Sequence, residues 1–340
     1  MSTKFLLSNM LIIMWFIGSG SVMDATQLFD STVENAFQKL YEDQKKAVWF
    51  PEEINVQQDM QDFRDLSEKE LFIFKNLIGY FVGSELLVQN VLGDTFYSYI
   101  KSPRCKMALS VQMFMEAIHN DYFEMILNTF SLDREEIYHI ADTNPVIMKK
   151  RKLVANAADS ISTTGHVDPD TLEGKKAILH AVLINNIVQE GIFFYSAFAA
   201  FFSMRDMGKF SNVCNGVDLV LIDESMHLKM GMEIIFTMIG ETPEILEDEE
   251  FVQKIQKTIV DAVDLELQFL EQQYGSGITF GINFKEMAEY LKYIADRRME
   301  ELGFGAYFWV SENPLKFLEK QDVMTLQNFF EVTPNQYTNS

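Results

Sequence analysis

Two glutamate–histidine pairs with the same spacing are the residues of this sequence best suited to chemistry. The chain has only five histidines. Two of them follow a glutamate by three positions, in Glu116-Ala-Ile-His119 and Glu224-Ser-Met-His227. On a helix, residues i and i+3 project from one face, so each pair offers a carboxylate and an imidazole to a single point. Both pairs lie in apolar runs, which predicts that they face a core.

Two further glutamates stand alone in apolar helical stretches. Glu85 lies within 80–88 and Glu190 within 187–194, and a lone buried carboxylate is costly unless a cation or a partner meets it. Glu85 precedes Glu116 by 31 positions and Glu190 precedes Glu224 by 34, which are helix–turn–helix distances. One Glu followed by one Glu-x-x-His, repeated on two antiparallel helix pairs, is typical of ferritin-like bundles that bind two iron or manganese ions.

The kinds of ligand also limit which metals fit. Four carboxylates and two imidazoles suit two mid-row divalent ions, because a softer ion prefers thiolate and magnesium does not favour imidazole. A third Glu-x-x-His, from Glu136 to His139, has no partner glutamate upstream, and we interpret it as a solvated helix face. His166 and His180 have no such neighbours and are expected to be structural or exposed.

The elements that must position these side chains are long helices. Gly and Pro are sparse, at 17 and 7 of 340 residues, and the apolar residues recur at helical spacing. Ser67 and Glu70 form a capping box, and Ser102-Pro103 is a second helix start. The expected fold is all-α, a ferritin-like bundle with a dinuclear metal site in a four-helix core. Helices are expected over about 67–99, 103–130, 132–141, 172–206, 212–239, 246–274 and 284–302, and 143–170 is expected to be mostly connection.

Composition limits the class of function. The chain has 28 Lys+Arg and 50 Asp+Glu, a formal net charge of −22, which argues against binding nucleic acid or an anionic membrane. Two cysteines, Cys105 and Cys214, without a CxxC spacing predict buried thiols in a reducing, cytoplasmic compartment. There is no Walker motif, GxGxxG or GxSxG to indicate phosphate binding or a nucleophilic serine.

Residues 1–22 differ in composition from the rest of the chain. Lys4 precedes a mostly apolar run, 5–17, and then Gly18-Ser-Gly-Ser21, as in a signal peptide, although the run is short for a membrane span. The alternative is a mis-started extension before a true start at Met23. No later stretch is expected to be a transmembrane candidate, because the long apolar helices carry Glu, Asp or His. The expected division is a leader-like 1–22, a metal-binding domain at 23–320 and a tail at 321–340.

Over 47–337 the sequence is similar to the small, radical-generating subunit of class I ribonucleotide reductase. The stretches that carry the resemblance are Trp49-Phe-Pro-Glu-Glu-Ile54, Met115-Glu-Ala-Ile-His119, Gln189-Glu-Gly-Ile-Phe-Phe-Tyr195, Ile222-Asp-Glu-Ser-Met-His227, Ile294-Ala-Asp-Arg-Arg298 and Asn328-Phe-Phe-Glu331 with Tyr337.

This resemblance implies a function and its residues. Asp223 would link His119 to Trp49 in a polar route for an electron and a proton, and Tyr337 would pass the oxidising equivalent to the large catalytic subunit. The two subunits together would reduce ribonucleoside diphosphates to deoxyribonucleotides, with the small subunit as a homodimer. The implied ligands of its two metal ions are Glu85, Glu116, His119, Glu190, Glu224 and His227.

Two departures from the family pattern indicate a subclass. The family's radical tyrosine lies seven positions after the first Glu-x-x-His glutamate, where this chain has Phe123, and a one-residue shift on a helix turns the neighbouring Tyr122 about 100° away. The first ligand is Glu85, where most members have Asp. Together these changes resemble the tyrosyl-radical-free members. We expect a manganese–iron centre activated by an oxygen-derived oxidant, with two irons or two manganese ions as alternatives.

Two other kinds of protein could use the same ligands. Homologous oxidases with a tyrosine–valine crosslink share the first Glu and a valine three positions on, here Val88, but their tyrosine would fall at Asn185. A ferritin-like oxidase or ferroxidase without a reductase partner stays open as the alternative function, and it would not require Trp49, Asp223 or Tyr337. The chain has only three residues after Tyr337, so the usual docking peptide for the large subunit is very short or the partner binds another surface.

Overall fold

The computed structural model describes residues 16–17, 32–162 and 167–318. Within these ranges the chain is helical, and its β contacts are two isolated bridges, from Ile17 to Ile100 and from Thr279 to Ile282. The α-helices are α1 (Thr32–Ala47), α2 (Met60–Arg64), α3 (Glu68–Val91), α4 (Tyr97–Tyr99), α5 (Pro103–Thr129), α6 (Arg134–Thr143), α7 (Pro145–Ile161), α8 (Leu172–Val182), α9 (Phe194–Asp206), α10 (Ser211–Glu241), α11 (Glu249–Tyr274) and α12 (Phe284–Glu301).

The remaining helical segments are of other types. Two are π-helices inside long helices: η4 (Leu92–Phe96) joins α3 to α4, and η5 (Leu183–Phe193) joins α8 to α9. Three are short 3₁₀ turns, η2 (Pro51–Glu53), η3 (Val56–Asp59) and η6 (Pro243–Glu247). A π-helix bonds i to i+5 instead of i+4, and such segments are frequent at functional sites.

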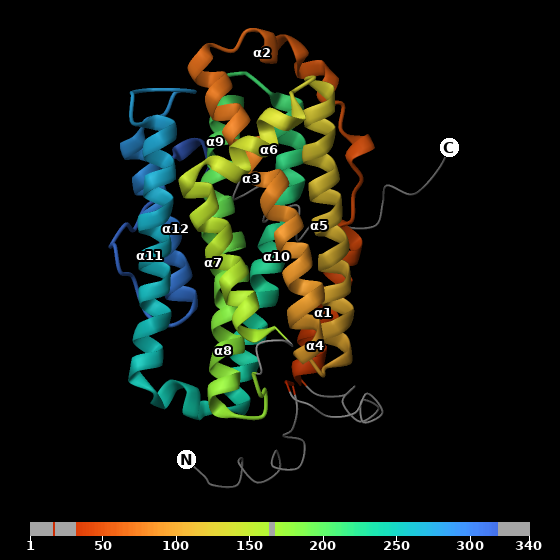
Figure 1. The fold of residues 1–340 in the computed structure, drawn as a ribbon, viewed down its shortest axis with the longest axis vertical. Coiled ribbons are helices and arrows are strands. Elements are labelled where there is room, and N and C mark those ends of the chain that lie inside the picture. The colour runs from red at the N-terminus through yellow and green to blue at the C-terminus, as the bar shows by residue number, and fades with distance from the viewer. Residues whose placement is uncertain (1–15, 18–31, 163–166, 319–340) are drawn as a thin grey trace.

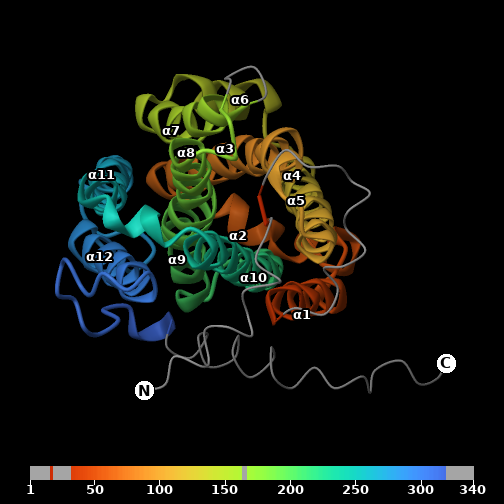
Figure 2. The ribbon, with the colours of Figure 1, turned by 90° about the horizontal axis from the view of Figure 1, so that it is seen from below.

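Four of these helices form the centre of the bundle. Helix α3 packs against α5, and α10 packs against both α5 and η5. The long helices run nearly parallel to the long axis of the molecule (Figure 1). Seen along that axis, α1 lies beside α5 and α10, α6 and α7 lie on the side of α3, and α11 and α12 form a pair on another side (Figure 2). The all-α, ferritin-like fold expected from the sequence is confirmed.

The helix starts follow the predicted capping residues. Ser67 Oγ accepts a hydrogen bond from the Glu70 amide, and the Glu70 carboxylate accepts one from the Ser67 amide at 2.9 Å, so the capping box of α3 is complete. Ser102 Oγ accepts from the Cys105 amide at 3.0 Å, and Pro103 is the first residue of α5. These caps set where α3 and α5 begin, two of the helices that carry predicted metal ligands.

The expectation that 143–170 is mostly connection is wrong. Residues 145–161 form α7, a helix of 17 residues. Asn144 Oδ1 accepts from the Val146 and Ile147 amides, and Pro145 stands at the first helical position, where its missing N–H costs nothing. Asn-Pro here begins a helix instead of ending one. Helix α1 packs against α5 and α10 and is not among the helices expected from the sequence.

Two residues of the leader-like range 1–22 lie in the described part of the chain. Phe16 is 3% exposed and its ring stacks on Phe37 of α1 with centroids 5.2 Å apart. Its carbonyl accepts from the Lys101 amide at 2.7 Å, and its amide donates to the Glu241 carboxylate. This dipeptide is therefore packed into the bundle. The rest of 1–22 and the tail at 321–340 lie outside the described residues, and the domain bounds stay a prediction.

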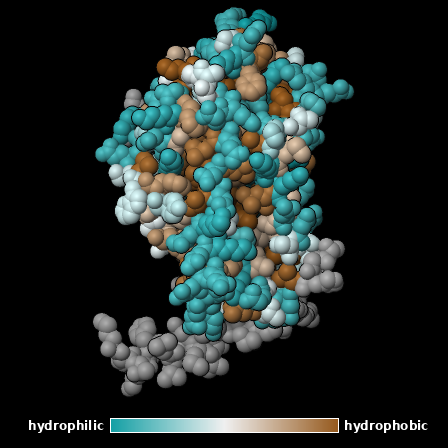
Figure 3. Space-filling model, turned by 60° about the vertical axis from the view of Figure 1, so that its left-hand side comes forward, coloured by the Kyte–Doolittle hydropathy of each residue, from teal (hydrophilic) through white to brown (hydrophobic). Residues whose placement is uncertain are grey.

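Two helical stretches, Glu68–Tyr99 and Leu172–Asp206, have the length and apolar content of a membrane span, contrary to the prediction that no such stretch follows residue 22. Their most apolar windows are 67% and 89% buried inside the bundle, as expected for core helices. The surface in Figure 3 is mainly hydrophilic, with hydrophobic residues showing between hydrophilic ridges. Cys105 and Cys214 are buried free thiols, as predicted.

Candidate metal centre

The six residues predicted to bind metal come together in the middle of the bundle. Each of them is 0% exposed. Helix α3 supplies one carboxylate, the π-helix η5 supplies another, and α5 and α10 each supply one carboxylate and one imidazole. The six side chains are Glu85, Glu116, His119, Glu190, Glu224 and His227.

Their atoms form two groups that share members. In each group, one ligand atom per residue lies within 4.8 Å of the others. Both groups contain Glu116 and Glu224. We call the group completed by Glu85 and His119 the first position, and the group completed by Glu190 and His227 the second position. Two carboxylates common to two positions is the arrangement of a dinuclear centre with bridging ligands.

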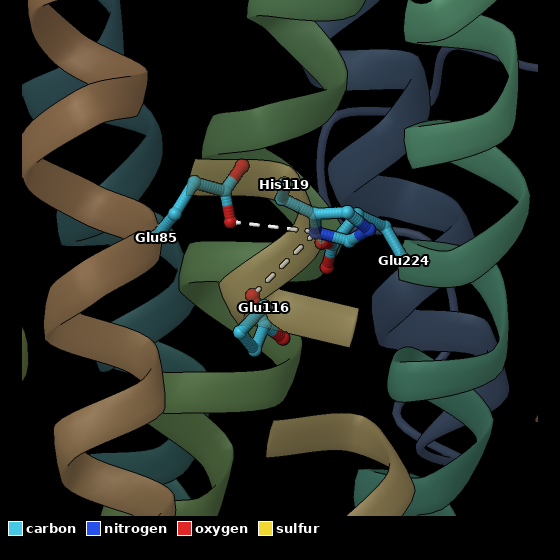
Figure 4. Close-up of side chains that lie close together, drawn as sticks. All are labelled: Glu85, Glu116, His119 and Glu224. Carbon is cyan, nitrogen blue, oxygen red and sulfur yellow. Dashed lines mark ion pairs between the residues drawn. The ribbon is translucent and has the colours of Figure 1, made fainter. Parts of the chain in front are cut away.

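The imidazoles point their Nδ1 atoms at the carboxylates. His119 Nδ1 lies 3.1 Å from Glu224 Oε1 and 3.6 Å from oxygens of both Glu85 and Glu116 (Figure 4). His227 Nδ1 lies 3.0 Å from Glu116 Oε1 and 3.4 Å from Glu224 Oε2. Each histidine therefore faces one carboxylate from its own helix and at least one from another.

The donor set fits two divalent cations. Three of the carboxylates, Glu85, Glu116 and Glu224, have no hydrogen-bond partner on either oxygen among the described residues, and the same holds for His119 Nδ1 and His227 Nδ1. Unpartnered polar atoms in a dry core are costly. Burial raises the pKa of Glu85 well above its ordinary value, which reflects the cost of carrying its charge there without a cation. Two divalent ions would balance four carboxylate charges.

One carboxylate next to the cluster connects it to an indole. Asp223 Oδ2 accepts from Trp49 Nε1 at 2.9 Å and lies 3.0 Å from His119 Nε2. When a metal ion binds Nδ1, His119 Nε2 would carry the proton and donate it to Asp223. Both Asp223 and Trp49 are buried, at 1% and 4% exposure. The structure thus brings Trp49, Asp223 and His119 together in the order that the resemblance implies.

Phe123 and Tyr122 point in different directions. Phe123 is fully buried and stacks on Phe81 of α3. Tyr122 meets Trp49 edge to face with centroids 5.5 Å apart, and its hydroxyl donates to the Val213 carbonyl at 2.6 Å. The prediction that Tyr122 turns away from the position of Phe123 agrees with this geometry.

The other histidines in the described residues lie apart from the cluster. His139 is exposed, and Glu136 pairs with Lys75 at 2.6 Å. His180 is partly buried and its Nε2 lies 2.9 Å from Thr258 Oγ1. His166 and Tyr337 lie outside the described residues.

Two residues of the Ile294–Arg298 stretch have structural partners near the centre. The Asp296 carboxylate accepts from the Tyr307, Phe308 and Val310 amides at 2.7, 2.7 and 2.8 Å, which fixes the loop after α12. Arg298 Nε donates to the Gly191 carbonyl at 3.1 Å, one residue after Glu190. This stretch therefore braces the π-helix that supplies a carboxylate to the cluster.

Sequence reasoning missed three amide side chains around Glu190. Gln112, Asn185 and Asn186 all donate to its carboxylate. Two consecutive asparagines in an apolar helical stretch were the available signal, because buried amides need partners. The five positions between Asn185 and Glu190 match a π-helix, whereas the four between Asn186 and Glu190 also fit an α-helix, and neither is the i+3 spacing that identified the histidine ligands.

The fold and this cluster define a class, the ferritin-like helical proteins with a candidate dinuclear centre of carboxylates and imidazoles. Residues 25–314 match the family model "Ribonucleotide reductase, small chain". The chain therefore belongs to the ribonucleotide reductase small-chain family.

Individual relatives agree with this assignment, and solved structures agree with the fold. The ribonucleoside-diphosphate reductase subunit beta of Chlamydia pneumoniae is 28% identical over 85% of this chain and 83% of its own length. The human subunit M2 is 25% identical over 88% of this chain and 72% of its own. The fold is similar to that of a putative class I ribonucleotide reductase from Bacillus halodurans (TM-score 0.75, 24% identity, 84% and 99% coverage) and of the dimanganese(II) NrdF of Streptococcus sanguinis (0.68, 20%, 85% and 95%).

Proposed function

We propose that this chain generates and stores the oxidising equivalent with which a class I ribonucleoside-diphosphate reductase starts ribonucleotide reduction. It is the small subunit of that enzyme, which works with a large subunit to supply deoxyribonucleotides for DNA synthesis. The observation that carries the proposal is the buried six-residue cluster with a hydrogen-bonded connection from His119 through Asp223 to Trp49.

The residues of the cluster would hold two metal ions, which supply the oxidising equivalent when bound. Glu116 and Glu224 belong to both groups of ligand atoms and would help to hold the ions at both positions. Asp223 keeps the proton of His119 on Nε2, so that Nδ1 is free as a ligand, and it accepts the Trp49 N–H on the same oxygen. Asp223 is therefore placed to take part when an electron and a proton leave the indole together.

Aromatic side chains keep this region dry. Phe81, Phe123, Phe194 and Phe198 are buried, and Phe81 contacts the other three with ring centroids 4.4 to 5.4 Å apart. Rings without polar atoms exclude water and offer no hydrogen atom that a strong oxidant removes as easily as that of a phenol. The cluster can therefore hold an oxidising equivalent on its metal ions.

The two departures from the family pattern favour a manganese–iron centre activated by an oxygen-derived oxidant, with two irons or two manganese ions as the alternatives. Phe123 lacks a phenol to store a tyrosyl radical, and Glu85 is longer than the usual aspartate. Metal analysis with electron paramagnetic resonance on the oxygen-treated protein tests this subclass. The expected result is both metals and no stable tyrosyl signal, and a stable tyrosyl signal would overturn it.

The proposed assembly is a homodimer in the cytoplasm that contacts the large subunit and neither nucleic acid nor a membrane. The net charge of −22 argues against binding to polyanions such as nucleic acid.

Tyr337 is the proposed exit for the oxidising equivalent. The Tyr337→Phe variant should keep its metal content and its reaction with oxygen while it loses turnover with a large subunit. Undiminished turnover would remove Tyr337 from the proposed route, and absence of turnover in the wild type itself would favour a ferritin-like oxidase without a reductase partner.

A further inference from the structure

Three buried amide side chains converge on one carboxylate of the cluster. Asn185 Nδ2 donates to Glu190 Oε1 at 3.1 Å and Asn186 Nδ2 to Glu190 Oε2 at 2.9 Å. Gln112 Nε2, on α5, lies 3.4 and 3.5 Å from the same two oxygens. The three amides are 0 to 1% exposed. We call Gln112, Asn185 and Asn186 the amide cradle.

The π-helix makes this cradle possible. In η5 the backbone bonds i to i+5, so that residues five and four positions before Glu190 share its face, whereas in an α-helix the residue five positions away points elsewhere. Helix α10 also makes room for it. A Cβ at Gly231 would lie 2.2 Å from Asn186 Cβ, and Asn186 Nδ2 lies 3.3 Å from the His227 carbonyl oxygen. Asn186 is thus wedged between the two ligand-bearing segments.

The cradle makes the surroundings of the two positions different. At the first position, Glu85 has no hydrogen-bond partner in the described chain, and His119 is tied to the anionic Asp223. At the second position, both oxygens of Glu190 accept hydrogen bonds, and His227 Nε2 has none from the described residues. An outer partner that fixes a ligand's orientation affects mainly the metal held by that ligand.

We propose that the amide cradle consists of positioning residues that fix the Glu190 carboxylate as a ligand of the second position, so that each position is tuned by its own outer residues. The cradle serves the second position and Asp223 the first. This inference rests on the proposed dinuclear centre. It assigns no contact with substrate to the three amides.

The test is anaerobic titration of the metal-free protein with cobalt(II). Calorimetry and the visible spectrum of the bound ion monitor the binding. Wild type should bind two ions per chain. Asn186→Leu keeps the side-chain shape and removes the donor, and it should weaken one of the two binding steps by about 10- to 100-fold and leave the other unchanged. Asp223→Asn should weaken the other step, because a neutral amide holds the His119 N–H less strongly than a carboxylate does.

Controls separate positioning from general damage. Asn76→Leu removes another buried amide, which donates within α3 to the Phe72 carbonyl, and it should leave both steps unchanged. Gln112→Leu removes the longest bonds of the cradle and should give a smaller loss in the same step as Asn186→Leu, which keeps the test available if Asn186→Leu does not fold. Equal weakening of both steps, or of neither, would overturn the inference. Failure of wild type to bind two ions would instead overturn the dinuclear centre.

Discussion

The ring of Phe123 stacks face to face on that of Phe81, with centroids 4.4 Å apart and ring planes 8° apart. Both rings are 0% exposed. The position at which the resemblance to the family leads us to expect a radical tyrosine is therefore filled by two hydrocarbon faces in contact. This packing explains how the bundle remains closed without the phenol: a face-to-face pair leaves no polar atom that needs a partner.

Phe123→Tyr should destabilise the protein. The added hydroxyl enters a fully buried aromatic site, and a buried hydroxyl without a partner costs about 1–3 kcal/mol. The free energy of unfolding of the metal-free variant, from urea denaturation, measures this cost. Leu40→Met on α1, a volume-conserving change at a partly buried site, is the control and should stay within about 1.5 kcal/mol of wild type. Unchanged stability of Phe123→Tyr would mean that the site contains an acceptor.

Trp49→Phe should separate metal binding from turnover. The variant lacks the N–H that bonds Asp223, but it keeps the contact between Asp223 and His119. We expect cobalt(II) binding like that of wild type and turnover with a large subunit reduced to background. Trp309→Phe is the matched control, because Trp309 is 82% exposed. Full turnover of Trp49→Phe would remove the indole from the proposed route.

The cluster could be predicted from the sequence because its ligands follow fixed helical geometry. His119 and His227 each lie three positions after a glutamate, and i+3 spacing places both side chains on one face whatever the tertiary structure. Glu85 and Glu190 stood out because a lone carboxylate in an apolar helix needs a compensating charge.

The features that could not be predicted depend on backbone changes or on contacts between distant segments. The bond of Asn185 to Glu190, across five positions, needs a π-helix, and the spacing of the residues in the sequence does not predict one. Asn144-Pro145 has residue types that are common both in turns and at helix starts. In the structure it begins helix α7. Phe16 packs on Phe37 from a segment distant in the sequence, and neither segment has a sequence pattern that predicts this contact.

Phe16→Ala should lower stability even though residue 16 lies in the leader-like range. The change removes a ring that is 3% exposed and stacked on Phe37, and Phe→Ala in a core costs about 3–5 kcal/mol. Thermal unfolding of the full chain and of a variant that begins at Met23 measures this contribution, and both changes should lower Tm. An unchanged Tm in both would mean that the N-terminal segment is dispensable for the fold.

His180 should make stability depend on pH. Burial, helped by Lys254, lowers the pKa of His180 to about 4, and its Nε2 contacts Thr258. The unfolded chain takes up this proton near pH 6.5 and the folded chain only near pH 4, so stability is present above pH 6.5 and falls between these values. The loss amounts to at most about 3 kcal/mol. His180→Gln keeps a hydrogen-bonding side chain, and its unfolding free energy, from urea denaturation at several pH values, should depend less on pH than that of wild type. The same dependence on pH in both proteins would contradict the lowered pKa of His180.

Lys150 and Glu266 form a buried ion pair that braces α7 against α11. Lys150 Nζ lies 2.6 Å from Glu266 Oε2 and 3.6 Å from the centre of the Tyr80 ring, and both charged side chains are 0% exposed. Burial lowers the pKa of Lys150, while the Glu266 carboxylate opposes that shift. Lys150→Met leaves a buried carboxylate without its cation, which should cost about 3–5 kcal/mol of unfolding free energy.

The double variant Lys150→Met/Glu266→Leu should recover most of that loss, because two apolar side chains often replace a buried ion pair without net cost. Lys257→Met, in the exposed pair with Asp261, is the control and should change the unfolding free energy by less than about 1 kcal/mol. Urea denaturation of the metal-free proteins gives all three values. If the double variant were as unstable as Lys150→Met, the loss would come from packing of the lysine stem among the aromatic rings, and not from the uncompensated charge.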